Sequence, residues 1–313
     1  MKISNVGIIG IGSYVPEKIL RNEDIDVFCK ETNAEWTKKN LGIDERRIVT
    51  DEYPSDLAYH ASLKAIEDAR IKKEDIDLII VATSSPDRIS PSTASIMAKR
   101  LGIKKPAFDV NAVCTGFVYA IQLATNLIST KQYKNVLVIG SDAYSRITDW
   151  TKRDCVFFGD GAGAIILSTV ENSWISTELY GDPIGKEAFT CYHDGKFSMD
   201  GKAVFDFGSK TLPNTILKSL EILDIKKEEI SWIVPHQPGH RVLLKTAETL
   251  DFPVEKIVFN MTKFANTAGA SIPMALDSLY KNDKLKDGNI IVMPAIGSGW
   301  TFGVSILKYT KHN

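Results

Sequence analysis

Cys114 is the residue whose surroundings point most directly to chemistry. It follows an apolar segment that ends at Phe108-Asp109-Val110, and it precedes a mostly apolar run of helical length, from Thr115 to Thr130. A strand, a turn and a helix in this order place the sulfur at a helix N-terminus, where free N–H groups and the helix dipole favour an anion. Such sites lower the pKa of a thiol from about 8.5 to about 3.5–7.5, and a thiolate is a strong acyl acceptor. The alternative is a small apolar core residue, because free cysteines are often buried.

Two further polar side chains follow expected strands in the second half of the chain. His236 comes after the segment Ser231 to Ile233, and Asn266 comes after the segment Ile257 to Asn260. A lone histidine is usually solvated, and an asparagine after a strand is more often a turn or cap residue. Neither residue indicates a site by itself, and their significance depends on the motifs that surround them.

Several motifs in a fixed order make the chain similar to a known family. The matching segments are Glu45–Ile48, Phe108–Phe117, Phe158–Ala164, Val234–Arg241, Phe264–Pro273 and Gly297–Gly303. The chain resembles the 3-oxoacyl-[acyl-carrier-protein] synthase III family, within the thiolase-fold condensing enzymes, and the resemblance covers nearly the whole chain. That family uses a cysteine, a histidine and an asparagine in this order, which implies that Cys114, His236 and Asn266 are catalytic.

The resemblance implies an enzyme of the acyltransferase class that catalyses a decarboxylative Claisen condensation. Cys114 would take an acyl group from acyl-CoA, while His236 and Asn266 would donate hydrogen bonds to the thioester oxygen of a malonyl unit as CO2 leaves. The backbone N–H groups of Cys114 and Ser298 would form the oxyanion hole, although the family usually has a glycine at the second position. Losing one such donor typically costs about 2.7–4 kcal/mol of barrier. The product would be a 3-oxoacyl thioester for fatty-acid or specialised, polyketide-like biosynthesis.

The resemblance also implies residues that bind the substrates. Trp36 and Arg153 would sandwich the adenine of CoA, Phe205 would line the tunnel, and Arg241 would meet the phosphopantetheine or the carrier protein. Ser90 stands where a bulky Phe of the neighbouring subunit often closes the acyl pocket, so a roomier pocket and acyl chains of medium length are expected. The implied partners are acyl-CoA, an acyl carrier protein and a second copy of the chain. The implied second substrate is malonyl-ACP or malonyl-CoA, with no tightly bound cofactor.

Two departures from the family pattern leave other functions open. His236-Gln237-Pro238-Gly239 replaces the usual His-Gln-Ala-Asn, and Asn40-Leu41 replaces an Arg-Thr pair. The first alternative is therefore an acyltransferase that moves the acyl group from Cys114 to an amine or alcohol without forming a C–C bond. A non-catalytic partner subunit is the second alternative, and retention of all three site residues argues against it.

The elements that must position these residues repeat along the chain. The expected strands are Asp77–Ala82, Ala107–Val110 and Asn135–Gly140 in the first half, and Ser231–Val234, Ile257–Asn260 and Asn289–Met293 in the second. Alternating strands and helices imply an α/β protein whose sheets are covered by helices. The resemblance implies a thiolase-like fold of two similar halves in five α-β-α-β-α layers. Residues 1–170 would carry the nucleophilic cysteine and residues 171–313 the histidine and asparagine, with a boundary after a strand that ends at Leu167.

Composition argues against several other classes of protein. The net charge of -1 and the absence of a long basic run argue against binding to nucleic acids or anionic membranes. No segment approaches the ~18 uninterrupted apolar residues of a membrane-spanning helix. Four cysteines without framework spacing, and no secretory signal, predict reduced thiols and a cytoplasmic location.

Two local patterns resemble cofactor and metal sites without the context that such sites need. Gly7, Gly10 and Gly12 have the spacing of a dinucleotide loop, but no helix opens after them. His236 and His240 have the spacing of metal ligands on one helix turn, but a proline and a glycine lie between them. We therefore expect neither a nicotinamide or flavin site nor a zinc site.

Overall fold

One long strand, β7 (Asp160–Gly181), runs through both halves of the chain. The computed structural model describes residues 1–183, 187–192 and 195–311. In the described part, β7 belongs to one eight-stranded sheet whose other members are β1 (Ile3–Tyr14), β4 (Leu78–Ala82), β5 (Ala107–Val110), β6 (Val136–Ala143), β10 (Ile230–Ile233), β11 (Ile290–Gly297) and β12 (Thr301–Lys308).

The two halves of the sheet have similar strand orders. The first half runs β5-β4-β6-β7-β1, and the second runs β10-β11-β12-β7. β5 is the outermost strand of the first half. At the corresponding place beside β10, the described part of the second half has an isolated bridge between Ile233 and Ile257 instead of a strand. The expected strand from Ile257 to Asn260 is therefore wrong. The strand expected to end at Leu167 is also wrong in length, because β7 continues through it without a break.

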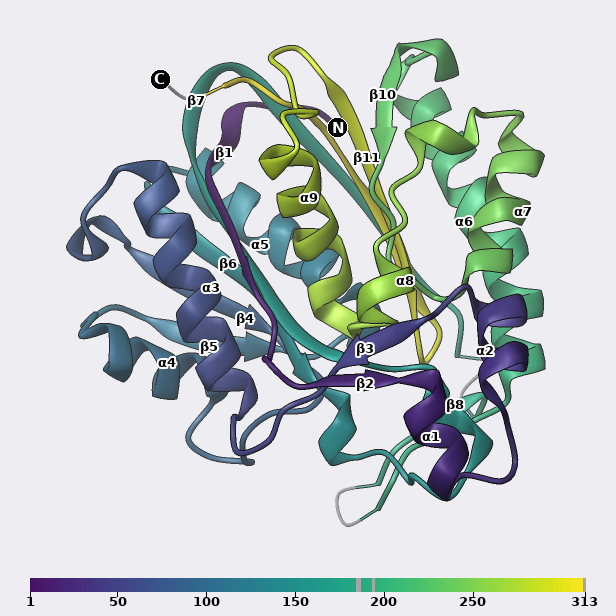
Figure 1. Cartoon of the computed structure of the whole chain (residues 1–313). Coiled ribbons are helices and arrows are strands. Elements are labelled where there is room, and N and C mark those ends of the chain that lie inside the picture. Colours follow the sequence, from purple (N-terminus) through teal and green to yellow (C-terminus); the bar gives the residue numbers. More distant parts are fainter. Residues whose placement is uncertain (184–186, 193–194, 312–313) are drawn as a thin grey trace.

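Helices lie on both sides of each half of the sheet (Figure 1). Three apolar clusters separate the layers: α3 and α4 pack on the outside of the first half, α5 and α9 lie between the halves, and α6 and α7 pack on the outside of the second half. The bounds are α3 (Pro54–Ala69), α4 (Thr93–Leu101), α5 (Gly116–Ser129), α6 (Gly201–Leu223), α7 (His240–Leu250) and α9 (Ser271–Lys281). The α/β class and the five α-β-α-β-α layers that the resemblance implies are thus confirmed.

Smaller elements complete the face that carries the site. They are α1 (Asn22–Phe28), α2 (Ala34–Leu41) and α8 (Met261–Phe264), with the short pairs β2 (Ile19–Arg21) and β3 (Glu45–Arg47), and β8 (Phe189–Thr190) and β9 (Ser198–Met199). Two of the helices that border the site begin at side-chain caps. Asn33 Oδ1 accepts from the Trp36 N–H at the start of α2, and Asp200 accepts from the N–H groups of Lys202 and Ala203 at the start of α6.

The glycines near the N-terminus have a packing role. Gly10 and Gly12 lie inside β1, against α3. A Cβ at Gly10 would lie 2.2 Å from the carbonyl oxygen of Ala65, and one at Gly12 would lie 2.6 Å from that of Ala61. Only glycine permits this close approach of helix to strand, which explains the spacing without a dinucleotide.

The expected boundary between the two halves, at residue 170, falls inside the continuous strand β7. The division into two halves at this residue therefore stays a prediction.

None of the helices in the described ranges is both long enough and apolar enough to cross a membrane. All four cysteines are free thiols; Cys29, Cys114 and Cys155 are buried and Cys191 is exposed.

Candidate active site

The same backbone turn occurs in both halves of the protein, and it leads into the two central helices. Asn111 Oδ1 accepts from the Val113 N–H at 3.2 Å, and Asn266 Oδ1 accepts from the Ala268 N–H at 2.9 Å. Val113 and Ala268 have positive φ angles of 49° and 47°. Each begins a 3-10 turn that runs directly into α5 or α9. A positive φ is strained for a β-branched residue, and such strain gathers at functional sites.

Cys114 follows the strained Val113 and lies two residues before α5 begins. It shares one small cavity, of about 40 Å³, with His236 and Asn266. His236 reaches this cavity from the segment after β10, and Asn266 reaches it from the turn before α9. The structure therefore brings together the three residues that the motifs single out, although they lie far apart in the sequence.

His236 and Asn266 are in direct contact. The Nε2 atom of His236 lies 3.1 Å from Oδ1 of Asn266, and the backbone N–H of His236 donates to the Pro294 carbonyl at 2.9 Å. Burial lowers the pKa of His236 to about 4, although its hydrogen bond to Oδ1 of Asn266 acts in the opposite direction, so the imidazole is neutral at pH 7. Because Oδ1 of Asn266 already accepts from Ala268, the amide Nδ2 is the atom left to donate to a ligand.

The thiol of Cys114 differs from the sequence-based expectation. Burial raises its pKa well above the ordinary value, and the nearby Asp142 carboxylate adds to the rise. The lowered pKa expected at a helix N-terminus is therefore wrong for the unliganded protein, because burial removes the water that would stabilise a thiolate. Cys114 is a neutral thiol in this state.

Ser298 is placed beside the nucleophile by the turn after β11. A Cβ at Gly297 would lie 3.1 Å from the backbone nitrogen of Cys114, which shows how closely this turn approaches the cysteine. The hydroxyl of Ser298 donates to the Phe189 carbonyl at 2.6 Å. The turn thus accommodates a serine where the family usually has glycine, and the backbone N–H is retained.

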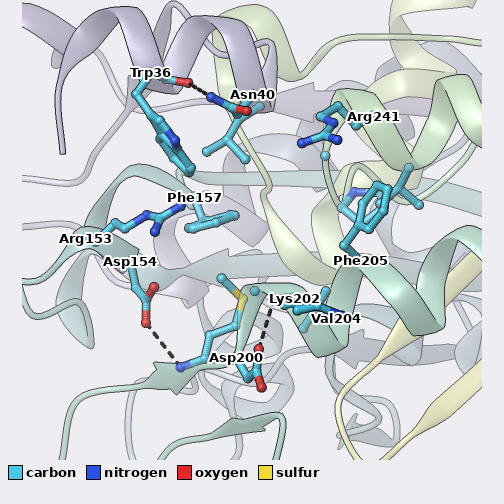
Figure 2. A pocket seen from close by; sticks show the side chains of 16 residues that line it. Trp36, Asn40, Arg153, Asp154, Phe157, Asp200, Lys202, Val204, Phe205 and Arg241 are labelled. Carbon is cyan, nitrogen blue, oxygen red and sulfur yellow. Dashed lines mark hydrogen bonds between the residues drawn. The ribbon is translucent and has the colours of Figure 1, made fainter. Parts of the chain in front are cut away.

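A larger pocket of about 490 Å³ adjoins the Cys114 cavity, and four residues line both: Phe157, Met199, Val204 and Pro238. Figure 2 shows its walls, which come from α2, α6, α7 and the segment around Arg153. All four residues assigned to substrate binding by the resemblance line it, namely Trp36, Arg153, Phe205 and Arg241.

Trp36 and Arg153 stack on each other instead of leaving a slot. The Arg153 guanidinium carbon lies 4.0 Å from the centre of the Trp36 ring. An adenine can enter between them only if one side chain moves, so the expected sandwich is not preformed. On the opposite wall the Arg241 guanidinium lies 5.2 Å from the ring centre of Phe205 (Figure 2).

The departures from the family pattern also fall in this pocket. Asn40, Leu41, Pro238 and Gly239 all line it. The side-chain amide of Asn40 donates to the backbone carbonyl of Trp36 at 2.9 Å, so this hydrogen bond lies within α2. Ser90 lies elsewhere: it is exposed, and it is absent from the described residues that line the Cys114 cavity of the same chain. Its assignment to an acyl pocket stays a prediction.

Comparison with known proteins identifies the family. The models for 3-Oxoacyl-[acyl-carrier-protein (ACP)] synthase III and its C-terminal part match residues 108–183 and 220–309. The chain is 43% identical to the beta-ketoacyl-[acyl-carrier-protein] synthase III of Clostridium acetobutylicum, over 99% of this chain and 100% of that protein. The chain belongs to the 3-oxoacyl-[acyl-carrier-protein] synthase III family.

Solved structures of the synthase III family have the same fold. The 3-oxoacyl-[acyl-carrier-protein] synthase III of Aquifex aeolicus superimposes with a TM-score of 0.95 at 38% identity, over 97% of this chain and 100% of that one. The priming β-ketosynthase of the R1128 polyketide biosynthetic pathway superimposes with a TM-score of 0.93 at 25% identity, over 98% of this chain and 97% of that one. The synthase III resemblance read from the motifs is confirmed.

Several residues at this synthase III site escape sequence analysis. Asp142 is the second-last residue of β6 and accepts from the Gly269 N–H, and four aromatic residues, Tyr144, Phe158, Phe189 and Phe197, gather beside Cys114. A charged residue at the end of the apolar strand Val136–Ile139 is the one local signal that could have marked Asp142. The aromatic residues carry no such signal, because they come from four separate segments.

Proposed function

We propose that this protein condenses an acyl-CoA with a malonyl thioester, using Cys114 as the acyl carrier. The observation that carries the proposal is the convergence of Cys114, His236 and Asn266 on one buried cavity that adjoins a pocket of about 490 Å³. The family membership supports the same activity, which its relatives' names describe as beta-ketoacyl-[acyl-carrier-protein] synthase III.

In the first half-reaction the Cys114 sulfur attacks the thioester carbonyl of acyl-CoA. A new S–C bond forms on Cys114, the bond to the CoA sulfur breaks, and the thiol proton leaves with CoA as CoA–SH. The backbone N–H groups of Cys114 and Ser298 stabilise the oxyanion of this step. Because the pKa of the resting thiol is raised, deprotonation accompanies attack instead of preceding it.

In the second half-reaction a malonyl thioester replaces CoA. Its carboxylate leaves as CO2 and its thioester becomes an enolate, whose oxygen accepts hydrogen bonds from His236 and Asn266. Burial keeps His236 neutral. A neutral imidazole can donate a hydrogen bond to this oxygen and still keep its proton. The enolate carbon attacks acyl-Cys114, the C–S bond breaks, and the released sulfur takes up a proton. The product is a 3-oxoacyl thioester.

The substrates and partners follow from the same proposal. CoA and the phosphopantetheine of an acyl carrier protein would occupy the larger pocket in turn, against Trp36, Arg153, Phe205 and Arg241. No tightly bound cofactor takes part. The protein would act in the cytoplasm as a homodimer that pairs through β5, which lies at the edge of the sheet and exposes Phe108.

Intact-mass spectrometry of acyl-enzyme formation tests the proposal. We expect acyl-CoA to add one acyl group to the wild-type protein, and added malonyl-carrier protein to remove it with release of CO2. Cys114→Ser should abolish the adduct, whereas Cys191→Ser, which changes the exposed cysteine, should retain it. An adduct on another cysteine of the Cys114→Ser protein would contradict the assignment. Transfer of the acyl group to an amine or alcohol without CO2 would favour the acyltransferase alternative.

A further inference from the structure

A buried carboxylate, that of Asp142, contacts the turn that carries Asn266. Its side chain is fully buried, and its Oδ2 accepts from the Gly269 N–H at 2.9 Å. A buried carboxylate is costly unless hydrogen bonds compensate the loss of water, so its partners show what the group does in the fold.

Gly269 has the same place in its turn as Cys114 has in the equivalent turn of the first half. Each directly follows the residue with a positive φ angle, and each is the second residue of a 3-10 turn. The Gly269 N–H is thus the counterpart of the Cys114 N–H, which we assign to the oxyanion hole. Where the Cys114 N–H would meet the oxygen of a substrate, the Gly269 N–H meets a carboxylate oxygen of Asp142. Asp142 therefore fills the counterpart of the oxyanion hole in the second half.

The backbone of Gly269 lies directly against β6. A Cβ at Gly140 of this strand would lie 2.1 Å from the carbonyl oxygen of Gly269, and a Cβ at Gly269 would lie 3.1 Å from Oδ2 of Asp142. The other end of the turn has a separate contact, since the Asn266 N–H donates to the Phe157 carbonyl at 3.1 Å. Asp142 thus fixes the end of the turn that leads into α9.

The other oxygen of Asp142 binds the segment that follows β4. Oδ1 accepts from the N–H groups of Ser84 and Ser85, at 2.8 and 3.1 Å, and from the Ser85 hydroxyl at 2.8 Å. One rigid group therefore joins the Asn266 turn to the end of a strand in the first half of the sheet. Because donors face both oxygens, only a group that accepts on both sides satisfies them.

We propose that Asp142 is a positioning residue that orients the amide of Asn266, through Gly269, for the enolate step. The inference rests on the proposed function and adds a residue to it. The N–H of Ala268, which directly precedes Gly269, is the group that Oδ1 of Asn266 accepts from. Loss of the Gly269 hydrogen bond would therefore displace the Ala268 N–H, and with it the amide of Asn266. A catalytic group misplaced by about 1 Å can cost about 10²-fold in rate.

Asp142→Asn tests this role with little change in shape. An amide has one acceptor oxygen, which should face the donors of Ser84 and Ser85, so its NH2 group meets the Gly269 N–H and that hydrogen bond is lost. We expect malonyl decarboxylation to fall by about 10-fold or more, and Cys114 acylation to fall by less than about 3-fold. Release of CO2 and the intact mass of the acyl-enzyme, followed on one preparation, give the two rates.

Ser85→Ala is the matched control, because it removes a donor to the same carboxylate from the opposite side. It should lower the stability of the protein and leave the ratio of the two rates unchanged. If Asp142→Asn does not fold, Gly269→Ala disturbs the same hydrogen bond from its other partner. Its new Cβ crowds Oδ2 of Asp142, and we expect the same selective loss of decarboxylation.

The two half-reactions also separate this inference from the proposed function. An equal fall of both rates in a folded Asp142→Asn protein, or an unchanged rate of decarboxylation, would overturn the positioning role alone. A wild type that forms no acyl-enzyme, or that releases no CO2 from the malonyl thioester, would overturn the proposed function as well.

Discussion

The imidazole Nε2 of His236 lies 3.1 Å from the amide Oδ1 of Asn266, in a cavity that both residues share with Cys114. The same Oδ1 accepts from the Ala268 N–H, so the orientation of the Asn266 amide is fixed by its own turn. The contact thus links a histidine after β10 to an asparagine before α9. It makes the pair a preorganised unit, and the two side chains are expected to act together.

Replacing Asn266 should separate the two half-reactions. Asn266→Ala removes a donor for the enolate oxygen but leaves Cys114 and its oxyanion hole in place. We expect acyl-enzyme formation to persist while malonyl decarboxylation falls by about 10²-fold or more, as for loss of a single oxyanion donor. Rates of acyl adduct formation and of CO2 release, measured on the same preparation, check this. Equal loss of both would indicate that Asn266 only supports the local fold.

The lowered pKa of His236 should make stability depend on pH. Burial sets this pKa at about 4 in the folded protein, against the ordinary value of 6.5. Between these values the unfolded chain binds a proton that the folded protein does not, so the free energy of unfolding falls as the pH falls. The contribution is fully present above pH 6.5 and is lost as the pH drops toward 4. From pH 7 to pH 5 the loss amounts to about 2 kcal/mol.

Urea unfolding of the wild type and of His236→Gln at pH 7 and pH 5 measures this effect. The variant should lose less stability than the wild type over the same interval. The comparison with the variant is needed because Asp160 acts in the opposite sense: burial raises its carboxyl pKa to about 6, which favours the folded state as the pH falls. Identical pH dependence in the two proteins would show that His236 titrates normally.

The stacked pair of Trp36 and Arg153 should affect the binding of CoA more than the rate of the chemical steps. Trp36→Ala removes the flat ring on which Arg153 now rests and on which an adenine would stack. We expect KM for acyl-CoA to rise by about 10-fold with kcat little changed, the pattern of lost uniform binding. Trp174→Ala is a matched control, because Trp174 lies in β7 and carries Lys2 over its ring, outside the larger pocket. An unchanged KM of Trp36→Ala would show that the adenine of CoA binds somewhere other than at Trp36.

The exposed edge of the sheet should be covered by a second copy of the chain. Phe108 is 37% exposed on β5, whose single strand partner in the described structure is β4, and Ile89 is 86% exposed in the loop before α4. Analytical ultracentrifugation at micromolar concentration should give twice the chain mass of 34.7 kDa. Phe108→Glu should shift the protein toward the monomer. A fully active wild-type monomer would contradict the homodimer.

The sequence by itself determined which three side chains are the candidate catalytic groups and their order along the chain. Cys114, His236 and Asn266 lie in short motifs with characteristic turn residues, and these motifs are readable because local backbone geometry depends on neighbouring residues. Strands such as β4 and β6 were predicted within a few residues for the same reason: each is a continuous apolar run. The family follows from these local patterns taken together.

Only the tertiary structure decided the properties that depend on burial and on distant contacts. It reversed the expected pKa shift of Cys114, because desolvation is set by every segment packed around the sulfur. It stacked Arg153 on Trp36, where two separate side chains were expected to flank a slot. It assembled Tyr144, Phe158, Phe189 and Phe197 from four segments into one wall. Such contacts join residues far apart in the chain, and no local pattern records them.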